Sequence, residues 1–394
     1  MPLSDIPYSR VRPQASSSRE TKRQSVIISG TTLGLGGIRT HLMSLCQLLR
    51  IRGFDVSLFA TGSHWDDESL NRVREMGVKI NLPPLSLQRF RKLSALHSRL
   101  SWPWRVPKTA NSLYCIGAGR SHLLMHQLRP RGTTSINHEI VEPPGPNSPA
   151  GHCAAGLDTT IANSRKVAES MRLYWPSKPI RVIPFLTSDR SMPVPKPRPA
   201  VGSGVLRVTY LGRLVDQKRP DLLVKRWQQL SALPGLSPAR LDVYGYDPSG
   251  AMLKELREYV MTSRLQDRVT VHGQYELSNL PGILSESDLV VLPSLWEGLP
   301  LVLVEAMLRG VPFVATAAGG TEELGDQNPD VLVTSTEWQD FERGLACMAA
   351  RLRVGDFNSI RLHAWAERRY GYAAVSQQWL DCVCEPRAFF GISS

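Results

Sequence analysis

Two acidic residues in the second half of the chain, Glu297 and Glu305, have the spacing and the surroundings of a ligand-binding loop. The apolar run 289–292 predicts a buried strand, and Gly298 and Pro300 suit an unusual turn and the first position of a helix. Backbone N–H groups at such a helix start point at an anion. Carboxylates there are good acceptors for the hydroxyls of a ribose or a sugar. On spacing alone, a solvated loop acid and a helix-face acid explain the pair equally well.

Two cations, Arg213 and Lys218, follow the apolar run 206–211. Two positive charges at the mouth of a sheet could neutralise a diphosphate leaving group, which gains negative charge as its bond to carbon breaks. The alternative is an ordinary solvated basic loop.

Glycine-rich turns follow other expected strands. Gly36 and Gly37 come after the first of them, and a second Gly-Gly pair lies at 319–320. Adjacent glycines allow the backbone to approach a ligand closely, although a plain tight turn has the same composition. His138 follows another strand, where a packed core histidine is the competing interpretation.

Short apolar runs alternate with amphipathic stretches along both halves, which predicts two doubly wound α/β sheets. In the first half, strands are expected at 25–30, 55–60, 111–116, 134–137, 159–162 and 181–184, with helices at 38–50 and from a Ser164 cap to 173. In the second half, strands are expected at 206–211, 240–244, 269–271, 289–292 and 313–315, and helices at 220–230, 250–264, 277–285 and 300–309. Ligands bind at the carboxyl ends of such strands, so two facing sheets predict a cleft for two substrates.

The chain divides into five parts. We expect a disordered Ser-, Pro- and Arg-rich tail, an acceptor-side domain, a Pro-rich linker, a donor-binding domain, and a helical segment that crosses back to the first domain. These parts span residues 1–24, 25–187, 188–204, 205–358 and 359–394.

Composition narrows the class of protein. A hydrophobic fraction of 42% and a charged fraction of 21% fit a folded chain, and no apolar run approaches the ~20 residues that span a bilayer. Six cysteines without a C-x-x-C pair favour reduced thiols in the cytoplasm. No Asp-x-Asp or similar ligand cluster stands in a fitting place, so the sequence predicts no metal and no cofactor beyond the substrates.

The net charge of +12 is concentrated in one stretch. Between Met76 and His138 there are ten Lys or Arg residues and no Asp or Glu, and the part 88–108 adds Phe90, Trp102 and Trp104. A solvated basic face and an anionic membrane surface are the two interpretations that we keep. Aromatic residues among cations also stack on nucleic-acid bases, but no nucleic-acid partner is expected.

The segment 292–307 resembles the signature of the retaining GT-B glycosyltransferases, in which seven residues separate two glutamates. The segment 210–220 resembles the same family's G-R-L-x-x-x-K pattern, which implies that Arg213 and Lys218 bind the donor phosphates. The resemblance covers most of 25–385 and is specific mainly over 207–324. It implies a GT-B fold of two Rossmann-like domains and a metal-independent enzyme. Glycogen, sucrose, trehalose and bacterial polysaccharide-building transferases belong to this family.

The resemblance also implies roles for residues of the second half. Glu305 would bind the donor ribose, and Glu297 would contact the donor sugar near the reacting carbon. The amides of Gly298, Leu299 and Leu301 would hold the sugar and the diphosphate. Many relatives carry Phe or Tyr where Leu299 stands.

In the first half, Gly36 and Gly37 would close over the diphosphate and the acceptor, while His138 would hydrogen-bond the donor sugar. Gly273 belongs to the segment 271–275, where relatives place the loop around the nucleotide base. Relatives often carry an acid where Arg39 stands, which implies a different acceptor end.

The predicted function is retaining transfer of a sugar from a UDP- or GDP-sugar to a hydroxyl acceptor, lipid-linked in many relatives. It would serve polysaccharide, glycolipid or glycoconjugate biosynthesis, in the cytoplasm or at the inner face of the membrane. Two alternatives stay open: another GT-B enzyme of epimerase or phosphorylase type, or a sugar- or nucleotide-binding protein with a decayed site.

Overall fold

The computed structural model describes residues 24–33, 36–65, 67–82, 91–117, 120–142, 145–187 and 193–392. The tail expected at 1–24 lies outside these residues except for Gln24. Residues 188–192 of the expected linker lie outside them as well.

A seven-stranded parallel sheet forms the first domain, in the order β3-β2-β1-β4-β5-β6-β7. Its strands are β1 Ser25–Leu33, β2 Asp55–Trp65, β3 Lys79–Asn81, β4 Ser112–Ile116, β5 Thr134–Glu139, β6 Thr159–Ala162 and β7 Ile180–Val182. The central strands β4, β5 and β6 are buried along their whole length. Buried parallel strands are usually apolar throughout, as β4 nearly is, whereas β5 and β6 are buried although they are rich in polar residues.

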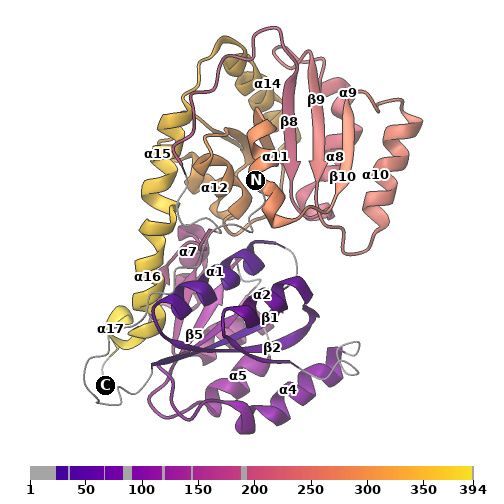
Figure 1. The fold of residues 1–394 in the computed structure, drawn as a ribbon. Helices are drawn as coiled ribbons and strands as arrows, with labels where there is room; N and C mark the ends of the chain where they lie inside the picture. Colours follow the sequence, from indigo (N-terminus) through magenta and orange to yellow (C-terminus); the bar gives the residue numbers. More distant parts are fainter. Residues whose placement is uncertain are drawn as a thin grey trace.

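Helices cover both faces of this sheet (Figure 1). They are α1 Gly37–Ile51, α2 Asp67–Glu75, α4 Arg91–Arg105, α5 Arg120–Gln127, α6 Pro149–Gly156 and α7 Arg165–Tyr174. The predicted cap of α7 is confirmed, because Ser164 Oγ accepts a hydrogen bond of 3.2 Å from the Val167 N–H.

A six-stranded parallel sheet forms the second domain, in the order β10-β9-β8-β11-β12-β13. Its strands are β8 Leu206–Leu211, β9 Ala239–Tyr244, β10 Val269–Gly273, β11 Leu289–Leu292, β12 Phe313–Thr316 and β13 Leu332–Thr334. In both sheets the strand order reverses beside the first strand, between β1 and β4 and between β8 and β11. Doubly wound sheets bind ligands at this switch point.

The helices of the second domain differ from the predictions in detail. They are η1 Asp216–Lys218, α8 Pro220–Lys225, α9 Trp227–Leu230, α10 Ala251–Thr262, η2 Leu277–Asn279, α11 Leu280–Glu286, α12 Leu301–Leu308, η3 Gly319–Thr321, α13 Glu322–Gly325 and α14 Trp338–Val354. The helix predicted at 220–230 is divided at Arg226. Pro300 is the N-cap residue of α12 and not its first helical residue, because its backbone is extended, with ψ 103°. The sequence did not predict the three-residue strand β13 or helix α14.

The last three helices are α15 Ser359–Tyr370, α16 Tyr372–Cys384 and α17 Pro386–Phe390. Helix α15 packs on the second domain, where His363 Nδ1 lies 2.7 Å from the Leu308 carbonyl oxygen. Helix α16 packs on the first, where Ser112 Oγ donates to the Val383 carbonyl at 2.6 Å. Figure 1 shows these yellow helices running along one domain and then the other. Among the described residues, no helix is both long enough and apolar enough to cross a bilayer.

Candidate active site

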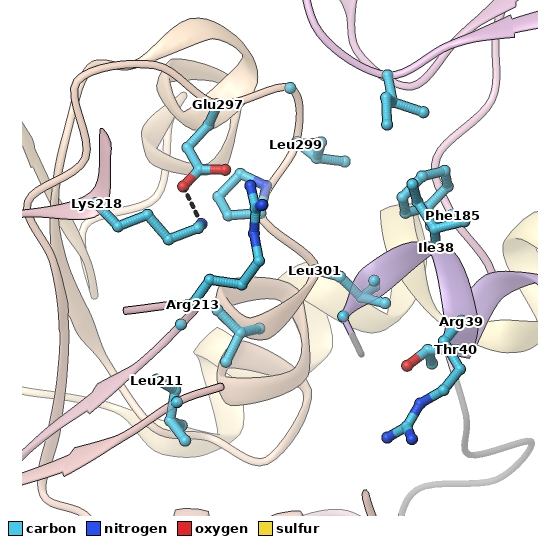
Figure 2. A pocket seen from close by; sticks show the side chains of 18 of the residues that line it. Ile38, Arg39, Thr40, Phe185, Leu211, Arg213, Lys218, Glu297, Leu299 and Leu301 are labelled. Carbon is cyan, nitrogen blue, oxygen red and sulfur yellow. Dashed lines mark hydrogen bonds and ion pairs between the residues drawn. The ribbon is translucent and has the colours of Figure 1, made fainter. Parts of the chain in front are cut away.

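A cavity of ≈ 440 Å³ lies between the two domains, at the carboxyl ends of their central strands. This volume is ordinary for a small-molecule site. The first domain lines it with residues 36–40, Ile140, Val141, Asn163 and Phe185. The second domain lines it with residues 211–213, Gln217, Lys218, Gly245, Tyr246, Gln274, Tyr275, Leu277, 296–302 and Glu305. Figure 2 shows side chains of both domains meeting around this space.

Lys218 and Glu297, both predicted from the sequence, form an ion pair on the wall of this cavity (Figure 2). Lys218 follows β8 and Glu297 follows β11, and these strands are neighbours in the sheet. The two side chains are only 11% and 10% exposed. Ser294 Oγ donates a 2.7 Å hydrogen bond to the same Glu297 oxygen. The carboxylate is thus held in place by a cation and a hydroxyl.

Arg213 stands at the exposed rim of the same wall. It donates to Gln217 Oε1 at 3.3 Å, and Gln217 Nε2 donates to the Trp296 carbonyl at 2.5 Å. The Leu295 N–H donates to the Gln217 carbonyl at 2.8 Å. Gln217 therefore joins the loop after β8 to the loop after β11. Gln217 adjoins Lys218, but no pattern in the sequence marked it as a site residue.

Gly298 brings the two domains into contact. A Cβ atom there would lie 1.6 Å from the Ile140 carbonyl oxygen and 2.7 Å from Asn163 Nδ2, both of the first domain. Gly298 does not have the positive φ of the unusual turn that was predicted, so the reason for glycine is close approach. Gly37 lies near as well, with its Cβ position 3.4 Å from Leu301 Cβ.

The second Gly-Gly pair supports the Glu297 loop from behind and does not line the cavity. Gly319 has φ +55°, and a Cβ there would lie 1.9 Å from the Glu297 carbonyl oxygen. The Gly320 N–H donates to the Gly298 carbonyl at 2.6 Å. The sequence predicted a close approach to a ligand here, whereas the structure shows a close approach to another loop.

Glu305 lies at the middle of α12, 4% exposed, and lines the cavity with Tyr275. Burial raises the pKa of Tyr275, and the negative charge of Glu305 raises it further. The positive charge of Arg39, on α1 of the first domain, opposes this rise. A carboxylate, a phenol and a guanidinium from two domains therefore line the same cavity.

The predicted base loop contributes Gln274 and Tyr275 to the cavity, but not Gly273. Gly273 has φ +89°, and its carbonyl accepts from the Gly245 N–H at 2.7 Å. Its role is to shape the turn. His272 stacks on Tyr244 with ring centroids 4.1 Å apart, away from the cavity lining.

His138 does not line the cavity either. It is 2% exposed and lies in a cluster of aromatic rings, with its Nδ1 2.5 Å from the Tyr114 hydroxyl. Burial lowers the pKa of His138 to about 3, so the ring is neutral near pH 7. This is the geometry of a histidine packed in the core, which was the competing interpretation of His138. Gly36 and Gly37, in contrast, line the cavity.

Within the described residues, His, Cys, Asp and Glu side chains do not gather in threes as metal ligands would. Metal independence stays a prediction.

Two doubly wound domains that face each other across a shared cavity define the GT-B architecture. HepE of Anabaena, solved in complex with UDP and glucose, matches with a TM-score of 0.69 and 19% identity, over 90% of this chain and 98% of that one. This likeness shows the fold. Residues 206–350 match the family of glycosyl transferases group 1. The second domain thus matches a glycosyltransferase family, and the whole chain has the GT-B fold.

Curated relatives align with less than half of the chain. The D-inositol 3-phosphate glycosyltransferase of Mycobacteroides abscessus is 29% identical over 161 residues, which cover 40% of this chain and 35% of that protein. The lipopolysaccharide core biosynthesis mannosyltransferase of Rhizobium meliloti is 38% identical over 123 residues, covering 30% and 33% respectively. The chain thus matches about a third of the length of these two relatives.

Proposed function

We propose that this chain is a retaining glycosyltransferase that moves a sugar from a UDP- or GDP-sugar to an acceptor hydroxyl. The observation that carries the proposal is the wall formed by Arg213, Lys218 and Glu297 at the switch point of the second sheet. This wall faces the first domain across a cavity whose volume is ordinary for a small-molecule ligand. The activities of the curated relatives and the UDP and glucose in complex with HepE support this donor chemistry.

Each charged group has a place in this scheme. Arg213 and Lys218 would bind the diphosphate, together with the positive end of the α12 dipole. Glu305, beside Tyr275, would accept hydrogen bonds from the ribose. Glu297 would accept a hydrogen bond from a hydroxyl of the donor sugar, and Lys218, its ion-pair partner, would contact the phosphates.

In the reaction, the bond from the anomeric carbon to the phosphate oxygen breaks and the diphosphate gains negative charge. The two cations stabilise that charge, a task that a metal performs in other enzymes. The acceptor oxygen attacks from the face that the diphosphate leaves, and its proton passes to the leaving phosphate oxygen. No cofactor and no separate general base enter the scheme.

Substitution of Lys218 by Met tests this assignment. Loss of the charge should lower kcat/KM for sugar transfer by about 10²- to 10³-fold. Lys225→Met is the matched control, because Lys225 lies in the same domain and pairs with Glu255 at 2.7 Å outside the cavity lining. The double variant Lys218→Met/Glu297→Gln removes both partners of the ion pair, leaves the net charge of the wall unchanged, and shows whether an unpaired Glu297 has damaged folding. Turnover equal to wild type in Lys218→Met would refute the role of this cation.

A thermal-shift panel identifies the donor. UDP, GDP and their hexose and N-acetylhexosamine derivatives should be compared, because a ligand at 100 times its Kd adds about 2.7 kcal/mol to the free energy of unfolding. Binding of a nucleotide sugar without release of nucleoside diphosphate in any acceptor mixture would favour the sugar-binding alternative.

We also propose that the first domain meets an anionic membrane through α4, as a lipid-linked acceptor would require. Leu96, Leu100 and Trp104 recur every four residues and are 49%, 68% and 89% exposed, so they form one apolar stripe. Trp102, on the opposite side of the helix, is fully buried against Phe59 at 4.6 Å between ring centroids. The acid-free basic stretch around this stripe supplies the complementary charge. The enzyme would then work at the inner face of the membrane in polysaccharide, glycolipid or glycoconjugate biosynthesis.

A further inference from the structure

Trp296 is a large apolar side chain that stays exposed at the edge of the cavity. It lines the cavity between the domains, yet it is 55% exposed. Its neighbour Leu295 is 44% exposed but does not line the cavity. Single exposed apolar residues are ordinary on a protein surface, whereas an exposed aromatic ring on the wall of a small-molecule cavity is placed to touch a ligand. Trp296 therefore stands at the mouth, where the cavity opens to solvent.

The backbone that carries this ring is fixed. Gln217 Nε2 donates to the Trp296 carbonyl, and the Gln217 carbonyl accepts from the Leu295 N–H at 2.8 Å. The next residue, Glu297, is only 10% exposed and pairs with Lys218. The neighbours of Trp296 on both sides are therefore anchored to the loop after β8. A ring that is held in place before a ligand arrives loses little conformational freedom on binding.

The strand order places Trp296 far from the predicted base loop. The second sheet runs in the order β10-β9-β8-β11, and the predicted base loop follows β10. The cations proposed for the diphosphate, Arg213 and Lys218, follow β8, whereas Trp296 follows β11. Two strands, β9 and β8, thus separate the base loop from Trp296. The proposed donor runs from the base, across the phosphates, to its sugar at Glu297. Trp296 lies at the sugar end, where the acceptor must enter.

Asn163 of the first domain offers a polar group to the same region. It follows β6, is 2% exposed and lines the cavity. Its Nδ2 donates to the Ile140 carbonyl at 3.0 Å and lies 2.7 Å from the Cβ position of Gly298, two residues after Trp296. That bond fixes which end of the amide carries the oxygen, because a carbonyl oxygen cannot donate.

The other end of this amide has an unused hydrogen-bonding capacity. Within the described residues, Asn163 Oδ1 accepts no hydrogen bond, although it is buried. An unpartnered buried oxygen is rare in a folded protein and needs a reason. Because an amide oxygen can only accept, the group that satisfies it must be a donor such as a hydroxyl. A hydroxyl of a ligand in the cavity would supply the missing donor.

These two groups together select a class of acceptor. The face of an indole ring packs on apolar C–H groups, and a sugar or cyclitol ring carries C–H groups on its faces and hydroxyls around its edge. An open-chain alcohol has no such rigid face. We propose that the mouth of the cavity binds the acceptor and that the acceptor is a cyclic polyol, a sugar or a cyclitol. Its ring stacks on Trp296, and one of its hydroxyls donates to Asn163 Oδ1. This acceptor class rests on the proposed function, which supplies the donor.

Transfer kinetics test the stacking contact. UDP-glucose and GDP-mannose are the donors, and the acceptors are myo-inositol, the methyl and octyl glycosides of glucose, galactose and mannose, and glycerol as the open-chain comparison. Trp296→Ala should lower kcat/KM for the cyclic acceptors about three- to tenfold, the value of one aromatic contact, without a matching loss for glycerol. Trp296→Phe, which keeps a flat ring, should recover most of this loss. Leu295→Ala is the matched control and should keep the wild-type values, because Leu295 is similarly exposed but lies outside the cavity lining.

Deoxy acceptors test the contact with Asn163. In the wild type, removal of the one hydroxyl that meets Oδ1 should lower kcat/KM about three- to tenfold, the value of one hydrogen bond. In Asn163→Leu, the parent and this deoxy acceptor should become equal substrates. Because both acceptors are compared within one variant, any general damage to the domain contact cancels. A deoxy penalty of the same size in Asn163→Leu would overturn this contact.

The remaining outcomes also decide the proposal. Binding of a donor without transfer to any cyclic acceptor would overturn it, as would wild-type kcat/KM in Trp296→Ala. An equal loss in Leu295→Ala would indicate a general apolar surface, such as a membrane contact, in place of a stacking site. A lower affinity for UDP-glucose relative to UDP in Trp296→Ala would assign the ring to the donor sugar instead. If neither nucleotide sugar binds the wild type, it is the proposed function that fails.

Discussion

Replacing Gly298 by Ala should separate the two domains while leaving each of them folded. The added Cβ would lie 1.6 Å from the Ile140 carbonyl oxygen, and contacts under 3.0 Å essentially never occur at a Cβ. The backbones must therefore move apart by about 1.5 Å, because a packed interface has no free space to absorb the methyl group. A displacement of about 1 Å in reacting groups can cost 10²-fold in rate. We expect kcat/KM for sugar transfer to fall by about that factor, or about 2.7 kcal/mol in the activation free energy.

The assay combines three measurements on Gly298→Ala. Transfer kinetics report the catalytic loss, affinity for the nucleoside diphosphate reports the second domain alone, and thermal unfolding reports the fold. The affinity and the melting temperature should change little, because the added atom meets the other domain and not its own core. Gly282→Ala is the control, since a Cβ there meets nothing within 4 Å. Wild-type kcat/KM in Gly298→Ala would refute the argument that this contact aligns the site.

Three further results are expected. Burial raises the pKa of Glu139 from 4.5 to about 7. Between these pH values the native state binds more protons than the unfolded state. The free energy of unfolding should therefore fall as pH rises from about 4.5 to 7 and stay level above pH 7. Glu139→Gln should remove up to about 3 kcal/mol of this dependence, measured as the free energy of unfolding against pH; parallel curves would contradict it. The protein should co-sediment with phosphatidylglycerol vesicles at low salt and leave them at high salt. Leu100→Glu should abolish that binding, whereas Leu173→Glu, on the exposed face of α7, should not. Arg165 of the first domain pairs with Glu323 of the second at 3.4 Å, but its side chain is 59% exposed. Arg165→Ala should therefore lower the free energy of unfolding by less than about 1 kcal/mol. A larger loss in a urea titration would show that this pair is more than a screened surface contact.

Much of the candidate site could be predicted, because the sequence patterns that mark it are local. The runs that became β8 and β11 were predicted with the correct ends, since buried parallel strands are apolar throughout. Arg213, Lys218, Glu297 and Glu305 were selected from short motifs at the ends of such strands, and all four line the cavity. The short edge strand β13 was missed, because three residues carry too little periodicity to be recognised.

Contacts between distant segments could not be predicted. Arg39 was noted only as a departure from a pattern, and its proximity to Tyr275 depends on how the two domains meet. Gly298 was explained by a turn, whereas its neighbour is a carbonyl of the other domain. His138 was placed beside the sugar by resemblance alone. Its hydrogen bond to Tyr114 comes from strand pairing, and its contact with the Trp379 ring comes from a helix that returns to the first domain.

The amino-acid sequence by itself determined the alternation of strands and helices, the chemistry of the loops that follow the strands, and the concentration of positive charge in the first half. These properties belong to residues a few positions apart. The tertiary structure alone decided that Lys218 pairs with Glu297, 79 residues away, and that Tyr114 lies between two histidines from separate elements. Such pairs form only when strand order and domain docking bring remote loops together, and those are set by the packing of the whole chain rather than by any one segment.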